Sequence, residues 1–125
     1  MSNKITIESL FSDSGPFNEE EVVTALLPHL IIQKNSKEIF FKDTKLSAEQ
    51  KILAYGLAKK LLKSQSLIES EMITAAEVAE KTGIKKGTID PAFKSLREKR
   101  GFLVGRKEYE IANQKIKEIL DFLIK

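Results

Sequence analysis

Residues 78–111 read VAEKTGIKKGTIDPAFKSLREKRGFLVGRKEYEI, and this stretch decides the fold. Its pattern predicts a short helix that Gly83 ends, because glycine readily adopts the left-handed conformation that closes a helix. A second helix is expected over 86–100, after a short turn. Two short apolar runs, 102–104 and 109–111, then flank a basic tip and predict a β-hairpin. The order of helix, turn, helix and hairpin predicts a helix-turn-helix motif followed by a wing.

The second helix of this motif has a clear inward face. Ile89, Phe93 and Leu96 are spaced by four and three residues, so they lie on one stripe of a helix. We expect this stripe in the core, with no role in binding a cofactor. Pro91 is compatible with the helix because we expect it in the first turn, where the backbone amides have no acceptor within the helix.

Positive charge gathers in the same stretch. The whole chain has a net charge of +3, whereas residues 81–107 have nine basic residues against Asp90 and Glu98, a net charge of +7. Residues 1–45 have a net charge of −2, and residues 46–125 have a net charge of +5. A basic cluster that coincides with a helix-turn-helix and a hairpin tip is typical of proteins that bind nucleic acid. The other interpretation is a solvated, lysine-rich surface without a ligand.

The stretch quoted above resembles winged-helix transcription regulators, and KKGTIDPAFKSL within it resembles the recognition helix of PadR-type regulators. The resemblance covers about 40 of the 125 residues. It implies that the start of this helix approaches DNA, that the wing contacts the DNA backbone, and that terminal helices form a homodimer. The residues to which it gives these DNA contacts are Lys86, Gly87, Thr88, Asp90, Pro91, Lys94, Arg106 and Lys107. The expected fold is mainly α (α+β), a winged helix-turn-helix with an N-terminal helix and β-hairpin extension.

The face of the second helix opposite Phe93 is expected to point outward. Its members are Gly87, Pro91, Lys94 and Glu98, flanked by Thr88, Asp90 and Ser95. This face has no Arg, Asn or Gln, the side chains that best make two hydrogen bonds to one base. We therefore expect phosphate contacts to supply most of the affinity, with modest direct readout of sequence. The side chains expected to contact phosphate are Lys85, Lys86, Lys94, Arg106 and Lys107.

The rest of the chain is expected to form an N-terminal extension over 1–45 and a main domain over 46–125. The extension is predicted to have a strand in its first ten residues, a helix that Asn18 caps and Pro28 ends, and a β-hairpin that ends near Lys42. The apolar face of that helix is expected to comprise Val22, Val23, Leu26 and Leu27. The main domain opens with the capping box SAEQ at 47–50 and a broad apolar arc, which predict a central, well-buried helix. A second capping box, TAAE at 74–77, starts the helix-turn-helix.

The last helix, which Asn113 is expected to cap, predicts an interface. Its inward stripe comprises Ile116, Ile119, Leu120, Leu123 and Ile124. Phe122 falls off this stripe, and a partner surface explains a large ring at an outward position. We therefore expect a two-fold homodimer through Ile119, Phe122 and Leu123. The alternative is that Phe122 packs against the N-terminal extension of the same chain.

The composition limits the chemistry. The sequence has no Cys and one His, His29, which excludes disulfides, thiol catalysis and zinc fingers and predicts no metal site. No nucleophile motif or glycine-rich phosphate loop is present, so we expect neither an enzyme nor a cofactor. The apolar runs are far shorter than the ~20 residues that span a bilayer, and the start has no signal-peptide pattern. We expect a cytoplasmic protein that does not contact membranes.

Two functions are consistent with these features. The first is a DNA-binding transcription regulator, whose partner is double-stranded DNA. The second is a winged helix used as a protein–protein assembly module without DNA binding, because this fold serves both purposes. In either case, the N-terminal extension is a candidate site for a protein partner.

Overall fold

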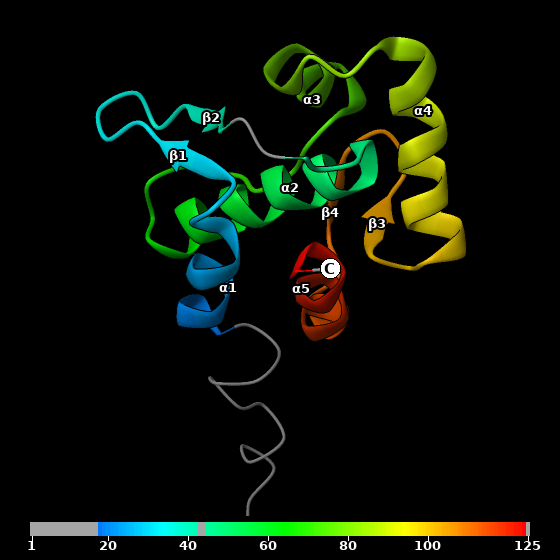
Figure 1. The fold of residues 1–125 in the computed structure, drawn as a ribbon. Coiled ribbons are helices and arrows are strands. Elements are labelled where there is room, and N and C mark those ends of the chain that lie inside the picture. The colour runs from blue at the N-terminus through cyan, green and yellow to red at the C-terminus, as the bar shows by residue number, and fades with distance from the viewer. Residues whose placement is uncertain (1–17, 43–44, 125) are drawn as a thin grey trace, which may run out of the picture.

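The computed structural model describes residues 18–42 and 45–124, which form a mainly helical fold with two small antiparallel hairpins (Figure 1). The predicted strand in the first ten residues lies outside the described residues. In chain order, the elements are α1 (Glu19–Leu26), β1 (Leu30–Ile32), β2 (Ile39–Phe41), α2 (Ala48–Ser64), α3 (Ala75–Thr82), α4 (Lys86–Lys94), the π-helical turn η2 (Ser95–Lys99), β3 (Leu103–Gly105), β4 (Tyr109–Ile111), the 3-10 turn η3 (Asn113–Lys115) and α5 (Ile116–Ile124).

The helix starts follow the predicted caps. Asn18 and Thr74 each accept a hydrogen bond from the backbone amide three residues on, at 3.1 Å. Ser47 and Gln50 form a reciprocal capping box, with the Ser47 amide donating to Gln50 Oε1 at 2.9 Å and the Gln50 amide donating to Ser47 Oγ at 3.2 Å. Gly83 ends α3 with a positive φ of 78°. These local signals confirm the predicted starts of α1, α2 and α3 and the end of α3.

The central helix α2 organises the fold, and it lies across the middle of the molecule in Figure 1. Ile52, Leu53 and Leu57 are fully buried, as the broad apolar arc predicts. At Gly56, an added Cβ would lie 3.0 Å from Cδ1 of Ile111, so β4 packs against the helix where a side chain is missing. The buried residues of α1, β2, α2, α3, α4, β4 and α5 belong to one hydrophobic core. Residues 18–42 of the N-terminal extension therefore pack on the main domain.

The segment before α3 pairs with the C-terminal hairpin. The Ile73 amide donates to the Tyr109 carbonyl at 2.8 Å, and the Tyr109 amide donates back to the Ile73 carbonyl at 2.7 Å. The ring of Tyr109 also contacts the ring of Phe93 on α4, and the two ring centroids are 4.7 Å apart. The hairpin β3–β4 is thus attached to both ends of the helix pair α3–α4.

A polar cluster joins α2 to α3. Glu77 accepts a hydrogen bond from the Tyr55 hydroxyl at 2.7 Å and forms an ion pair with Lys59 at 2.8 Å. Burial, followed by the hydrogen bond to Glu77, raises the pKa of Tyr55 well above its ordinary range. The Tyr55 hydroxyl therefore stays protonated and continues to donate to Glu77.

Three expectations about apolar and proline positions are wrong. Val23 and Leu27 are exposed, because α1 packs on its neighbours through Val22, Ala25 and Leu26. Ile124 is exposed at the end of α5 rather than part of its inward stripe.

Pro91 lies beyond the first turn of α4, which begins at Lys86. Proline has no amide hydrogen, so Pro91 cannot donate the helical hydrogen bond to the carbonyl of Gly87, four residues earlier. The helix continues past Pro91 because Ile89, Phe93 and Leu96 are buried in the core.

We predict that Leu96→Ala lowers the free energy of unfolding by about 2–5 kcal/mol, because it leaves a cavity at a fully buried position of η2. Leu67→Ala is the matched control, since Leu67 is half exposed and its truncation should change the stability by less than about 0.5 kcal/mol. Urea denaturation followed by circular dichroism measures both values. Equal effects of the two variants would contradict the packing described for α4 and η2.

Candidate nucleic-acid interface

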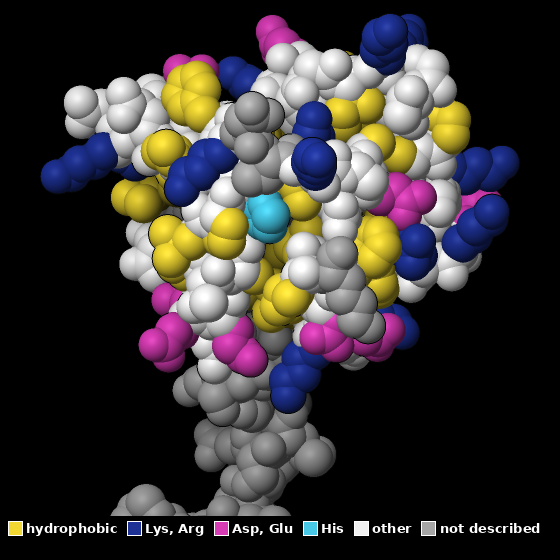
Figure 2. All heavy atoms as spheres, viewed as in Figure 1, with side chains coloured by type: hydrophobic (Ala, Val, Ile, Leu, Met, Phe, Trp, Pro, Cys, Tyr) yellow, Lys and Arg dark blue, Asp and Glu magenta, His cyan; other side chains and the backbone are white. Residues whose placement is uncertain are grey.

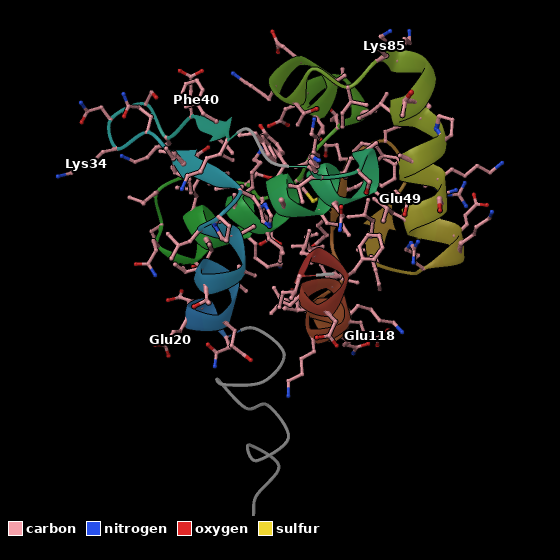
Figure 3. The ribbon with its side chains drawn as sticks, in the orientation of Figure 1. Glu20, Lys34, Phe40, Glu49, Lys85 and Glu118 are labelled. Atoms are coloured by element: carbon pink, nitrogen blue, oxygen red, sulfur yellow. The ribbon has the colours of Figure 1, made fainter. Side chains whose placement is uncertain are left out.

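The predicted DNA-contact residues lie on α4, at its N-cap, at the first residue of η2 and at the tip of the hairpin β3–β4. The exposed ones are Lys85, Lys86, Gly87, Thr88, Asp90, Pro91, Lys94, Arg106 and Lys107. Ser95, the first residue of η2, is half-buried. Lys85 stands at the N-terminal end of α4, at the outer edge of the molecule (Figure 3). The tip residues follow β3, which η2 joins to α4.

Most of the basic residues in this region form no ion pair with the part of the chain that the structure describes. Within 81–107, three cations are paired among the described residues: Lys81 with Glu38, Arg97 with Glu98, and Arg100 with Glu49. The remaining six have no ion pair with any described residue; they are Lys85, Lys86, Lys94, Lys99, Arg106 and Lys107. Lys and Arg side chains gather along the outer edge of α4 (Figure 2). All five predicted phosphate-contacting side chains belong to this unpaired group.

Acidic side chains interrupt this basic surface at two points. The hydrogen bond from Arg97 to Glu98, followed by the charges of Lys94 and Arg97, lowers the pKa of Glu98. Glu98 therefore remains charged and neutralises part of the positive surface of η2. Asp90 is exposed on α4 with no ion pair among the described residues, so it is available to accept a hydrogen bond from a ligand.

The start of α4 is open in two respects. Lys85 at the N-cap makes no side-chain capping bond, so the first backbone amides of the helix receive no side-chain acceptor there. Gly87 has no positive φ, and a Cβ added to it would meet nothing within 4 Å. Packing therefore does not require glycine at this position, although glycine costs helix stability. The missing side chain leaves room for a ligand to approach the backbone closely.

The hairpin tip, in contrast, requires its glycine. Gly105 has a φ of 115°, and an added Cβ would lie 2.0 Å from the Glu108 carbonyl oxygen. The Gly105 carbonyl also accepts a hydrogen bond from Nη1 of Arg97 at 3.4 Å. This tight turn fixes where Arg106 and Lys107 leave the sheet, and Arg97 connects it to η2.

One edge of α4 faces a shallow groove that the sequence did not predict. The groove has a volume of about 560 Å³ and is lined by Ser47, Ala48, Glu49, Thr88, Pro91, Ala92, Arg100 and Phe122. Thr88 and Pro91 therefore line the same groove as the ion pair between Glu49 and Arg100. No local signal in the sequence links Glu49 to Arg100, since they are 51 residues apart.

The residues predicted to form a dimer interface have contacts within the chain. Ile119 and Leu123 are buried in the core. The Phe122 ring lies 6.0 Å from that of Phe102, and the Arg100 guanidinium lies 4.3 Å from its centroid. The ring therefore packs on the main domain of its own chain, and a second subunit is not needed to explain its position. The reason for placing a dimer contact at Phe122 is removed, and dimerisation itself stays a prediction.

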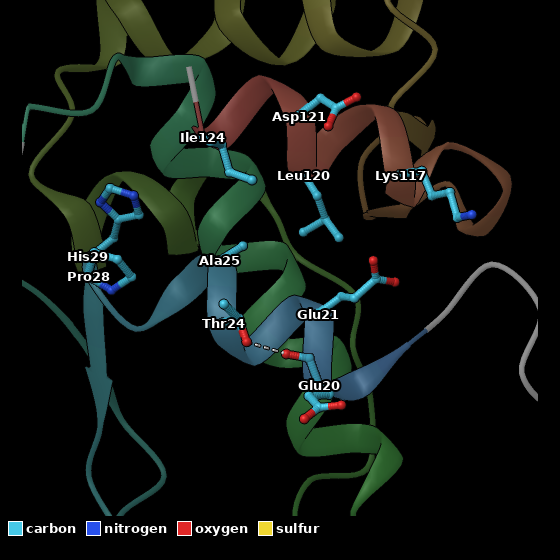
Figure 4. Close-up of a pocket in the computed structure, with 10 residues that line it drawn as sticks. All are labelled: Glu20, Glu21, Thr24, Ala25, Pro28, His29, Lys117, Leu120, Asp121 and Ile124. Atoms are coloured by element: carbon cyan, nitrogen blue, oxygen red, sulfur yellow. Dashed lines mark hydrogen bonds between the residues drawn. The ribbon is translucent and has the colours of Figure 1, made fainter.

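Another groove lies between α1 and α5 and has a volume of about 810 Å³ (Figure 4). Glu20 and Glu21 on α1 and Lys117 and Asp121 on α5 line it, and His29 lies at one end. Among residues 18–42 and 45–124, no group of three or more His, Asp or Glu side chains is placed to hold a metal ion. No helix in the same part of the chain is long and apolar enough to cross a membrane.

Comparison with known proteins yields no relative: no family model, no curated protein and no solved structure matches the chain.

We predict opposite effects of two Gly→Ala substitutions in this region. Gly105→Ala should lower the free energy of unfolding by more than about 1 kcal/mol, because alanine is strained at this φ and its Cβ would clash with the backbone. Gly87→Ala should raise it by about 0.5–1 kcal/mol, because α4 has space for the methyl group. Thermal and urea unfolding measure both effects. Destabilisation by Gly87→Ala would show that packing requires glycine at this position.

Proposed function

We propose that residues 46–125 form a winged helix that binds double-stranded DNA and serves as a transcription regulator. The order of elements supports this fold, since α2, the Ile73 segment, α3, α4 and the hairpin β3–β4 follow one another, and Ile73 pairs with Tyr109. In this arrangement α4 is the recognition helix and the tip Gly105–Glu108 is the wing. The N-terminal extension is an addition to this domain.

The observation that carries the proposal is the set of unpaired cations on α4 and the wing. Lys85, Lys86, Lys94, Arg106 and Lys107 are exposed and form no ion pair with any described residue. Lys81, Arg97 and Arg100 in the same stretch are paired with carboxylates. Most of the unpaired cations lie on the recognition helix and the wing, the two parts that a winged helix presents to DNA. Phosphates would supply the missing negative charges and release the counterions condensed on DNA.

The start of α4 fits the close approach of a phosphate or a base edge. Gly87 has no side chain, the amides of the first turn have no side-chain cap, and Lys85 and Lys86 flank them. A helix N-terminus favours an anion through its exposed amides and its dipole. Thr88 and Asp90 are the polar side chains nearest to this end, and they are our candidates for base contacts. Their short side chains support a modest degree of sequence readout.

The competing function is a protein-assembly module on the same fold. Asp90 and Glu98 on the outer side of α4 and η2 favour it, because carboxylates repel phosphate. Val104, which is half exposed on β3, would be available for an apolar contact. A binding assay with generic duplex DNA distinguishes the two functions.

We predict that duplex DNA binds with an affinity that falls steeply with salt. If four to six phosphates are contacted, the plot of log K against log salt should have a slope of roughly −4 to −5. Lys85→Gln combined with Lys86→Gln should make the slope shallower by about 2. Lys117→Gln, at an exposed position of α5, is the control that should leave it unchanged. Absence of binding at low salt, or a flat salt response, would contradict DNA binding and favour the assembly module.

We further predict that the wing positions the protein whereas α4 reads the sequence. Arg106→Ala combined with Lys107→Ala should weaken binding to all duplexes by the same factor, because phosphate contacts carry no sequence information. Thr88→Ala should change the preference between a selected duplex and a random one. Competition binding with the two duplexes measures both effects. An unchanged affinity and preference in Thr88→Ala would exclude the proposed groove contact.

A further inference from the structure

A second surface lies on the side of the molecule opposite α4, where α1 and the hairpin β1–β2 project (Figure 1). Four large apolar side chains are exposed there: Val23 at 42%, Leu27 at 59%, Ile31 at 55% and Phe40 at 53%. We call these four residues the hairpin patch. Apolar side chains exposed singly are ordinary, but a group of four on one face indicates a binding surface.

The four side chains form one continuous surface. Val23 lies on α1 and Leu27, four residues later, is its C-cap with helical backbone angles, so both side chains lie on the same face. Ile31 and Phe40 are directly opposite each other in the β1–β2 ladder, so their side chains point to the same side of the sheet. Val23, Leu27 and Ile31 also line one shallow groove of about 290 Å³. The groove joins the helix part of the patch to the strand part.

The groove is almost entirely apolar. Its other lining residues are Leu26, Leu30, Ile32, Leu61 and Lys42. The Lys42 ammonium donates to the Leu27 carbonyl at 2.8 Å, so it is held at the edge of the groove. The groove therefore fits an apolar side chain of a protein partner and offers little to a polar small molecule.

Charges of opposite sign lie at the two ends of the patch. The first turn of α1 is acidic, and Glu20, three residues before Val23, is exposed and without an ion pair among the described residues. The β1–β2 turn at the other end is basic, with Lys34 exposed and likewise unpaired. Figure 3 shows Glu20 and Lys34 at opposite ends of this part of the molecule, with Phe40 on the hairpin.

We propose that the hairpin patch is the contact between two copies of this chain. A two-fold axis through the patch places the acidic end of one copy against the basic end of the other, while the apolar side chains meet in the middle. Such a surface is complementary to itself, which a two-fold interface requires. An acidic or basic partner of another kind would match only one end of the patch.

This dimer leaves α4 and the wing of both copies accessible, because they lie on the other side of the molecule. It does not depend on the proposed function: self-association can be measured without DNA. Two recognition helices in one particle would add to the affinity for a DNA with two half-sites.

Sedimentation of the full chain tests the proposal, over concentrations up to about 1 mM. We expect a concentration-dependent dimer, and Ile31→Glu or Phe40→Glu should raise its dissociation constant by about 30-fold or more, as the loss of a central contact does. Ile124→Glu is the matched control, since Ile124 is an equally apolar exposed residue on α5, and it should leave the dimer intact. Circular dichroism checks that each variant is folded.

Charge reversal tests the arrangement of the two copies. Glu20→Lys and Lys34→Glu should each weaken self-association, because each variant places like charges at both ends of the interface. An equimolar mixture of the two variants should restore the dimer, since each end then meets the opposite charge.

A monomer at every concentration would overturn the proposal, and so would a dimer that Ile31→Glu leaves intact or Ile124→Glu disrupts. A mixture of Glu20→Lys and Lys34→Glu that stays monomeric would overturn the two-fold arrangement.

Discussion

The rest of the structure depends on the burial of the apolar side chains of α2. This helix is apolar over so wide an arc that no single neighbour can shield it, and α1, α4, α5 and β4 all pack against it. The position of β4 follows from this burial, because Gly56 lets Ile111 come close to the helix axis. Once β4 is fixed, the bridge between Ile73 and Tyr109 places the segment that leads into α3. The geometry of the basic surface is therefore set from inside the molecule.

The fold could be predicted from the sequence at most positions where the signal was local. The expected cap at Asn113 is wrong, because Asn113 lies within η3 and its side chain makes no capping hydrogen bond at the start of the last helix. Asn18, Ser47, Thr74 and Gly83 mark helix ends by chemistry that acts within a few residues, and the structure has the ends there. Predictions failed where tertiary contacts decide. The contacts of Phe122 could not be predicted, because Phe102 and Arg100 are about 20 residues away in the chain but adjacent in space. Val23 and Leu27 are apolar at helical spacing, yet nothing in the described residues covers them.

The candidate site was predictable as a set of residues but not as an electrostatic surface. The sequence shows nine basic residues in 81–107 without showing which of them are neutralised. Glu38 and Glu49 come from distant parts of the chain and pair with Lys81 and Arg100, which leaves unpaired charges on α4 and the tip of the β3–β4 hairpin. Pairing across the fold thus concentrates the free positive charge on one part of the surface, although the total charge is only +3.

The π-helical turn η2 has a consequence for comparing this chain with others. Within it the Arg100 amide donates to the Ser95 carbonyl at 3.1 Å, five residues back, so the turn contains one residue more than an α-helical turn would. A protein of the same fold with an ordinary helix there would reach its β3–β4 hairpin one residue sooner. An alignment that permits no gap between Lys94 and Gly101 would then match each residue of β3, the tip and β4 with the neighbour of its true counterpart. In such an alignment, the inward and outward positions of both strands would be exchanged.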